Sequence, residues 1–156
     1  MKEETILDVY WEGPFSWNKR QRHLKTGHVL YALYGAHHAY GPNVLLYIGR
    51  TTRGVGKRLD AHASWVGEEY DPMTLRLASI GPITTWSEWD DHERYGPATE
   101  KLVAAAEALL IYALQPAYNK SSKETLGAGK GFRIFNTGMI GTMLPEVSHR
   151  YHDDGW

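Results

Sequence analysis

The chain has 156 residues, no cysteine, 22% charged residues and a formal net charge of −1. This length suits one domain with a single core, and the lack of cysteine excludes disulfides, thiolate metal sites and a cysteine nucleophile. The first residues lack the pattern of a signal peptide, and no apolar run is long enough to span a bilayer. We therefore expect a cytoplasmic protein without a membrane partner.

Charge is segregated along the chain although the total is close to neutral. Residues 18–58 contain no acidic residue, whereas residues 68–100 are rich in Asp and Glu. Such segregation can give a neutral protein one positive face, which binding to phosphate groups needs. Two solvated surfaces without a partner are the alternative. The basic residues of the first stretch are Lys19, Arg20, Arg22, Lys25, Arg50, Arg53, Lys57 and Arg58.

The first half of the chain predicts two adjacent strands. Residues 5–11 fit an edge strand or an arm. Residues 29–34 and 44–49 are short, apolar and aromatic-rich, as expected of buried strands. The Gly41-Pro42 pair between them is a turn signal, so we expect an antiparallel hairpin with a long loop.

The second half predicts a helix, a strand and a longer helix. A Gly-Pro pair opens the longer helix, and Pro116 stops it. After Asn119 the chain is rich in glycine. The expected elements are a helix at 55–66, a strand at 74–83, a loop or short helix at 86–95, a helix from Gly96 to about Leu114 and strand-like residues at 132–135.

Glu107 is the most informative single residue because it lies in the apolar part of the longer helix. Lys101 is the only other charged residue between 101 and 114. A helix that is apolar on every side is buried, and a buried carboxylate costs several kcal/mol unless it is paired or bound to metal. We interpret Glu107 as a ligand of Mg²⁺, which often takes only one or two protein carboxylates. A structural ion pair with an arginine is the alternative.

Two further pairs of residues offer chemistry. Arg58 and His62 are four residues apart, so both project from one face of the first predicted helix. Arginine suits phosphate oxygens, and histidine can exchange a proton or hold an attacking water, although a solvated face explains the pair as well. Tyr31 and Tyr47 lie on the two paired strands, where either packing or activation of water beside Arg50 explains them.

The order and spacing of these residues resemble the GIY-YIG nuclease family. Tyr47-Ile48-Gly49-Arg50 resembles the second signature of the family, and Val29-Leu30-Tyr31 stands where the first should be. Residues 58–62 resemble its Arg-x3-His helix, and residues 107–119 resemble its segment from glutamate to asparagine. The resemblance covers about residues 27–120.

The resemblance implies a fold and an activity. The expected fold is α/β of the α+β kind, a small three-stranded antiparallel sheet flanked by helices. One domain over 1–156 would hold a nuclease core at about 27–120, an N-terminal basic arm at 1–26 and a C-terminal extension at 121–156. The implied function is that of a metal-dependent endonuclease that hydrolyses phosphodiester bonds in DNA with Mg²⁺ (or Mn²⁺). A catalytically inactive nucleic-acid-binding module of the same fold and an RNA- or structure-specific nuclease are the alternatives.

The resemblance also implies roles for single residues. Glu107 would hold the metal, and Arg58 would neutralise charge in the transition state. A tyrosine would activate or orient the attacking water, with His62 as helper or rival base. Asn119 would position a substrate oxygen or a catalytic side chain, unless it only closes a helix end. The residues expected to be catalytic are Tyr31, Tyr47, Arg58, His62, Glu107 and Asn119.

The expected partner is nucleic acid, double-stranded DNA before RNA, bound by a monomer or a homodimer. The basic residues before the first hairpin strand would grip the phosphate backbone as a flexible arm, and a solvated surface run is the alternative. The residues expected to bind substrate are Arg50, Lys57, Lys19, Arg20, Arg22 and Lys25.

Overall fold

The computed structural model of the chain describes residues 4–23, 27–51, 73–82 and 98–152. The predicted helix at 55–66 and the polar segment at 86–95 lie outside these residues. Four of the predicted functional residues also lie outside them, namely Lys25, Lys57, Arg58 and His62.

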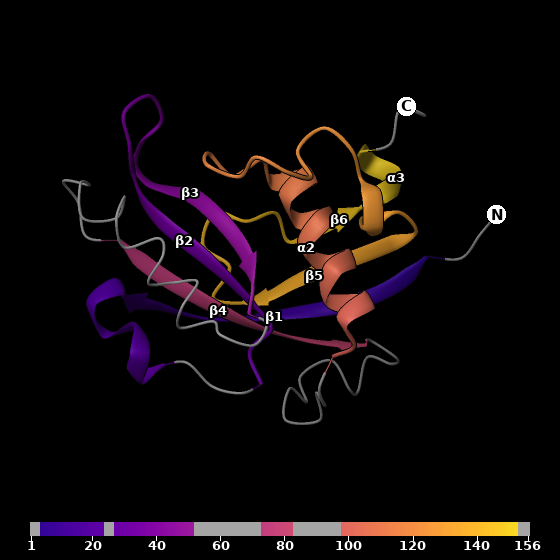
Figure 1. The fold of residues 1–156 in the computed structure, drawn as a ribbon, viewed down its shortest axis with the longest axis horizontal. Coiled ribbons are helices and arrows are strands. Elements are labelled where there is room, and N and C mark those ends of the chain that lie inside the picture. The colour runs from indigo at the N-terminus through magenta and orange to yellow at the C-terminus, as the bar shows by residue number, and fades with distance from the viewer. Residues whose placement is uncertain (1–3, 24–26, 52–72, 83–97, 153–156) are drawn as a thin grey trace.

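Six strands form one curled sheet in the order β3-β2-β4-β1-β5-β6 (Figure 1). Neighbouring strands are antiparallel except β1 and β5, which run parallel. The expected three-stranded antiparallel sheet flanked by helices is therefore wrong. The strands are β1 (Thr5–Ser16), β2 (Leu30–His37), β3 (Gly41–Arg50), β4 (Thr74–Pro82), β5 (Phe132–Gly138) and β6 (Glu146–Ser148).

The correction arises from the two ends of the chain, which lie outside the resemblance to the nuclease family. Strand β1, expected at an edge or in an arm, lies between β4 and β5. Its residues Leu7, Val9 and Trp11 are at most 1% exposed. The residues that alternate with them, Ile6, Asp8 and Tyr10, are mixed in polarity and do not show where in a sheet the strand lies. Alternation describes one strand, but it does not say which distant strand will pair with it.

The elements predicted from periodicity between residues 29 and 114 are confirmed where the structure describes them. Strands β2, β3 and β4 and helix α2 overlap their predicted ranges. Thr99 caps α2 by accepting a hydrogen bond from the N–H of Leu102 at 3.4 Å, and Gln115 ends the helix with a φ of 50°. Among the described residues, no helix is long and apolar enough to cross a membrane. The helices are η1 (Trp17–Arg22), α2 (Glu100–Leu114), η4 (Gly127–Gly129) and α3 (His149–His152).

The sheet has two differently covered faces. Alternate residues of β2 enter two separate hydrophobic clusters, so the clusters lie on opposite faces. The first, which we call the helix face, contains Ala32, Ile48 and most of the buried residues of α2. The second, which we call the tyrosine face, contains Tyr31, Tyr47 and residues of η1 and β4.

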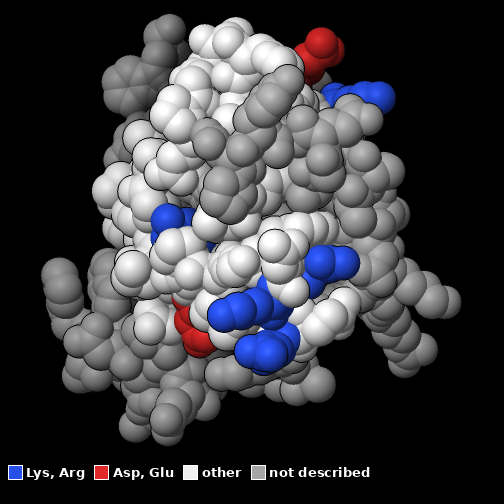
Figure 2. All heavy atoms as spheres, turned by 90° about the vertical axis from the view of Figure 1, so that its left-hand side faces the viewer, with Lys and Arg blue, Asp and Glu red and all other residues white. Residues whose placement is uncertain are grey.

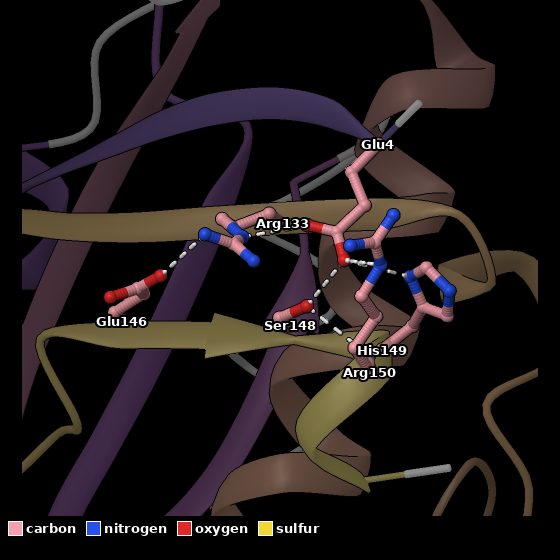
Figure 3. A network of polar contacts seen from close by, with 6 residues as sticks. All are labelled: Glu4, Arg133, Glu146, Ser148, His149 and Arg150. Atoms are coloured by element: carbon pink, nitrogen blue, oxygen red, sulfur yellow. Dashed lines mark hydrogen bonds and ion pairs between the residues drawn. The ribbon is translucent and has the colours of Figure 1, made fainter. Parts of the chain in front are cut away.

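Glu4 ties the beginning of the chain to its end (Figure 3). Its carboxylate accepts hydrogen bonds from Nε of Arg133 at 2.6 Å and Oγ of Ser148 at 2.8 Å, and it pairs with Nε of Arg150 at 2.9 Å. Burial raises the pKa of Glu4, but these hydrogen bonds and the two arginine charges outweigh it and hold the pKa below its ordinary value. The complete network contains Glu4, Arg133, Glu146, Ser148, His149 and Arg150.

Replacing Glu4 with glutamine is expected to lower Tm by about 3–6 °C at neutral pH, because charged hydrogen bonds are lost. A carboxylate whose pKa is lowered by folding stabilises the fold above its unfolded pKa of about 4.3, and this stability is lost as the pH falls through the folded pKa. The Tm difference between wild type and variant should therefore be full above about pH 5 and shrink below about pH 4. Thermal melts across this range test it, with the exposed Glu124→Gln as control. A difference that persists in acid would contradict the role of the charge.

Candidate active site around strand β3

Tyr31 and Tyr47 lie side by side on the tyrosine face. Their ring centroids are 5.9 Å apart, and the rings are 25° from parallel. Tyr31 faces Gly49 across the β2–β3 ladder. A Cβ atom on Gly49 would lie 2.4 Å from both Cζ and the hydroxyl oxygen of Tyr31, so only glycine lets the ring lie across β3. Tyr31 is 0% exposed, whereas the side chain of Tyr47 reaches the surface in part.

Glu107 forms an ion pair with Arg50, at 3.4 Å between Oε1 and Nε. The two side chains are 20% and 29% exposed, so the carboxylate is less deeply buried than the apolar sequence of α2 predicts. Arg50 follows Ile48 by two residues and therefore lies on the helix face. A partly exposed pair of this kind contributes about 1 kcal/mol. The structure thus contains the ion pair with an arginine that was the alternative interpretation of Glu107. The role of Glu107 as a metal ligand stays a prediction.

The segment after α2 closes the outer edge of β3. The N–H of Tyr118 donates to the carbonyl of Leu46 at 2.8 Å. Asn119 then bonds to both backbone groups of Ile48, because its Oδ1 accepts from the N–H at 3.0 Å and its Nδ2 donates to the carbonyl at 2.9 Å. The side chain replaces a neighbouring strand and fixes the backbone in the middle of the Tyr-Ile-Gly-Arg stretch. Asn119 therefore closes a strand edge and not a helix end.

Replacing Asn119 with alanine is expected to lower Tm by about 4–8 °C, because the buried N–H and carbonyl of Ile48 both lose their partner. Asn119→Asp keeps an acceptor but loses the donor, so its Tm should fall between those of wild type and alanine variant. Thermal melts measure both, with the exposed Asn18→Ala as control. A wild-type Tm for Asn119→Ala would contradict the bracing role.

Each residue of the stretch 47–50 contacts another member of the predicted site. Tyr47 and Gly49 contact Tyr31, Ile48 bonds to Asn119, and Arg50 pairs with Glu107. The described part of the site is thus gathered around one end of β3. The two tyrosines lie on the tyrosine face, however, while Arg50 and Glu107 lie on the helix face.

A carboxylate that the sequence did not single out lies on the tyrosine face. Glu12 of β1 pairs with Leu77 of β4, which pairs in turn with Tyr31. Nε2 of His28 lies 3.5 Å from Oε2 of Glu12, and the two side chains are 4% and 35% exposed. No pattern in the sequence could have found this pair, because only long-range pairing brings β1 beside β4.

The basic residues before β2 belong in part to the folded structure. Trp17 anchors η1, since it is 6% exposed and its N–H donates to the carbonyl of Met73 at 3.0 Å. Cζ of Arg20 lies 4.5 Å from the ring centroid of Trp17, and Nη1 donates to the Trp17 carbonyl at 3.2 Å. Lys19 and Arg22 are exposed. The described basic residues therefore sit on an anchored helix, not on a flexible arm.

No protein-family model, curated protein or solved structure matches the chain. The resemblance to the GIY-YIG nucleases therefore rests on the residues and their spacing. Among the residues that the structure describes, no group of three or more His, Cys, Asp or Glu side chains could hold a metal ion.

Proposed function

We propose that the chain is a metal-dependent endonuclease that hydrolyses phosphodiester bonds in nucleic acid, with double-stranded DNA as the first substrate to test. The observation that carries the proposal is the gathering of the described motif residues at positions 47–50 of β3. Tyr31 and Tyr47 flank this stretch on one face of the sheet, while the Arg50 guanidinium and the Glu107 carboxylate lie beside it on the other face. Phosphodiester hydrolysis needs these groups to orient water, to neutralise phosphate charge and to hold a hard metal ion.

The residues around β3 fit one hard divalent ion better than a site with many ligands. Glu107 offers carboxylate oxygens at a partly exposed position. Mg²⁺ or Mn²⁺ can take a single carboxylate and complete its shell with phosphate oxygens and water. When bound, such an ion would stabilise charge on the phosphate and on the leaving oxygen. Arg50 restrains the Glu107 carboxylate and offers its guanidinium to a phosphate oxygen.

Tyr47 is better placed than Tyr31 to hold the attacking water, because part of its side chain reaches the surface. Tyr31 is a positioning residue in this proposal. Its buried ring lies against Tyr47 and across Gly49, so it restricts the directions in which the Tyr47 hydroxyl can point. Loss of the Tyr47 hydroxyl should therefore lower the rate more than loss of the Tyr31 hydroxyl.

Incubation with supercoiled plasmid, linear duplex and single strands tests the proposed activity, in Mg²⁺, Mn²⁺ or EDTA. We expect nicked or linear plasmid with a metal ion and none with EDTA. Tyr47→Phe should lower the rate by about 10²-fold with little change in binding. Binding without cleavage in every metal would instead identify a catalytically inactive binding module, and cleavage of RNA alone would identify an RNA nuclease.

The exposed cations of η1 are the described residues best placed to bind the phosphate backbone. Helix η1 lies on the left in Figure 1. Figure 2 views the molecule from that side and shows several Lys and Arg side chains gathered on one part of the surface. Within η1, Lys19 and Arg22 are exposed, while Arg20 is held against Trp17. Part of the basic stretch of the sequence is therefore exposed on the surface that the structure describes.

Replacing Lys19 and Arg22 together with alanine is expected to reduce the slope of log K against log salt by about two units on duplex DNA, since each phosphate contact contributes about 0.9. Affinity should fall about equally for all sequences. Binding isotherms in a salt series measure the slope. The matched control removes two exposed lysines from other elements, Lys101 and Lys130. Equal slopes in wild type and the Lys19/Arg22 variant would reject this surface as the binding site.

A further inference from the structure

Arg76 of β4 carries a buried positive charge, and none of the carboxylates that the structure describes lies beside it. The residue is 7% exposed, and among the described residues no Asp or Glu forms an ion pair with it. Its Nη1 donates to the carbonyl of Met139, and its Cζ lies 5.0 Å from the ring centroid of Tyr34. Its Nε is buried and makes no hydrogen bond in the described structure. A buried cation without a counter-charge is strongly unfavourable, so the site is incomplete as described.

The other arginines that the structure describes differ from Arg76. Arg50, Arg133 and Arg150 each pair with a carboxylate. Arg20 resembles Arg76 in lying over an aromatic ring and donating to a backbone carbonyl, but it is only partly buried. Among the described arginines, Arg76 therefore differs in being buried and in having no carboxylate as an ion-pair partner.

The loop between β5 and β6 covers Arg76 and is held in place. The side chain of Asn136 accepts from Nε1 of Trp11 at 2.9 Å and donates to the carbonyl of Leu144 at 2.9 Å. Gly141 has a φ of +59°, and a Cβ atom there would lie 2.9 Å from Nη2 of Arg76. The lack of a side chain at Gly141 therefore leaves space for the guanidinium, and the hydrogen bonds of Asn136 hold the loop in position beside it.

Two residues around this guanidinium carry hydroxyl groups, namely Tyr34, whose ring lies against it, and Thr142, which follows Gly141 in the chain. The buried hydroxyl of Tyr34 interacts with Thr142 without a hydrogen bond of regular geometry. Burial raises the pKa of Tyr34 against the opposing effects of Thr142 and the Arg76 charge, so the hydroxyl keeps its proton at neutral pH. Thr142 itself is exposed, which connects the group to the surface. A guanidinium and two hydroxyls from three elements are donors that suit a tetrahedral oxyanion.

We propose that Arg76, Tyr34 and Thr142 form a binding site for a phosphate group at the loop between β5 and β6. The phosphate supplies a counter-charge that Arg76 lacks among the described residues, and it accepts hydrogen bonds from the guanidinium and from the exposed Thr142 side chain, while the Tyr34 ring lies against the guanidinium. This site is separate from residues 47–50, and it does not depend on the chain being a nuclease. The phosphate can belong to a free phosphorylated compound or to a nucleic-acid backbone, which the experiment distinguishes.

Thermal melts in inorganic phosphate, against chloride at equal ionic strength, test the site. Wild-type Tm should rise by about 3–6 °C once phosphate exceeds its dissociation constant about tenfold. Arg76→Met should show only the general salting effect of phosphate, and without phosphate it should be as stable as wild type or more so, because an uncompensated charge is gone. Arg76→Lys should keep a weaker response. The matched control Arg20→Met, which alters a similar arrangement elsewhere, should keep the full response.

Equal phosphate responses in wild type and Arg76→Met would overturn the proposal. A marked fall in the Tm of Arg76→Met without phosphate, combined with no specific response of the wild type, would also overturn it and assign Arg76 a structural role. Salt-dependent binding of duplex DNA separates the two sources of phosphate. A slope smaller by about one unit in Arg76→Met identifies a backbone phosphate, and an unchanged slope with an intact phosphate response identifies a free phosphorylated compound.

Discussion

Replacing Glu107 with glutamine is expected to lower metal-dependent cleavage by about 10²-fold or more. The amide keeps the shape of the side chain but loses the negative charge that would hold Mg²⁺, and charge stabilisation by a metal supplies several kcal/mol of the rate enhancement. Binding of DNA in EDTA should change little, because the cations at the site remain. Rates on supercoiled plasmid, measured beside binding in EDTA, test both parts.

Because Glu107 also forms an ion pair with Arg50, the stability of Glu107→Gln must be measured beside its activity. Both side chains are partly exposed, so its loss should lower Tm by only about 2–4 °C. Glu100→Gln, on the exposed first turn of the same helix, is the matched control and should be active and stable. An active but strongly destabilised Glu107→Gln would assign the carboxylate to structure. Loss of cleavage in Glu12→Gln alone would place the metal on the tyrosine face.

Replacing Gly49 with alanine is expected to lower the free energy of unfolding by about 3 kcal/mol, equivalent to a fall in Tm of about 6–12 °C. The new methyl group would lie 2.4 Å from Cζ of Tyr31, whose side chain is fully buried, so the ring or the strand must shift. Cleavage should fall as well, since a displaced Tyr31 no longer positions Tyr47. Thermal melts and plasmid assays follow the two effects.

Two companion variants test the steric cause. Gly27→Ala is the matched control, because a Cβ atom there has no neighbour within 4 Å. Combining Gly49→Ala with Tyr31→Leu should restore part of the stability lost in Gly49→Ala, since the smaller side chain relieves the overlap. If the effects of the two changes simply add, the contact between Gly49 and the Tyr31 ring is not the cause.

Local patterns in the sequence predicted the central part of the fold. Short apolar runs indicated β2, β3 and β4, and the Gly-Pro and Pro116 signals bounded α2. Motif spacing also selected Tyr31, Tyr47, Arg50, Glu107 and Asn119, which the structure gathers around β3. The predictions of these strands and of α2 succeeded because periodicity, turn residues and caps act over a few neighbouring residues, which sequence order preserves.

Only the tertiary structure decided the rest. The parallel pairing of β1 with β5 joins opposite ends of the chain, so the local sequence of β1 could not reveal its central place. The antiparallel pairing of β1 with β4 brings Glu12 to the tyrosine face, and the side-chain hydrogen bonds of Asn136 hold the loop over Arg76. The ion pair of Glu107 depends on how α2 packs against β3, and the burial of Arg76 depends on a loop that follows it by many residues. A side chain's type and spacing are local properties, whereas its burial and its partner depend on contacts between segments that sequence order keeps apart.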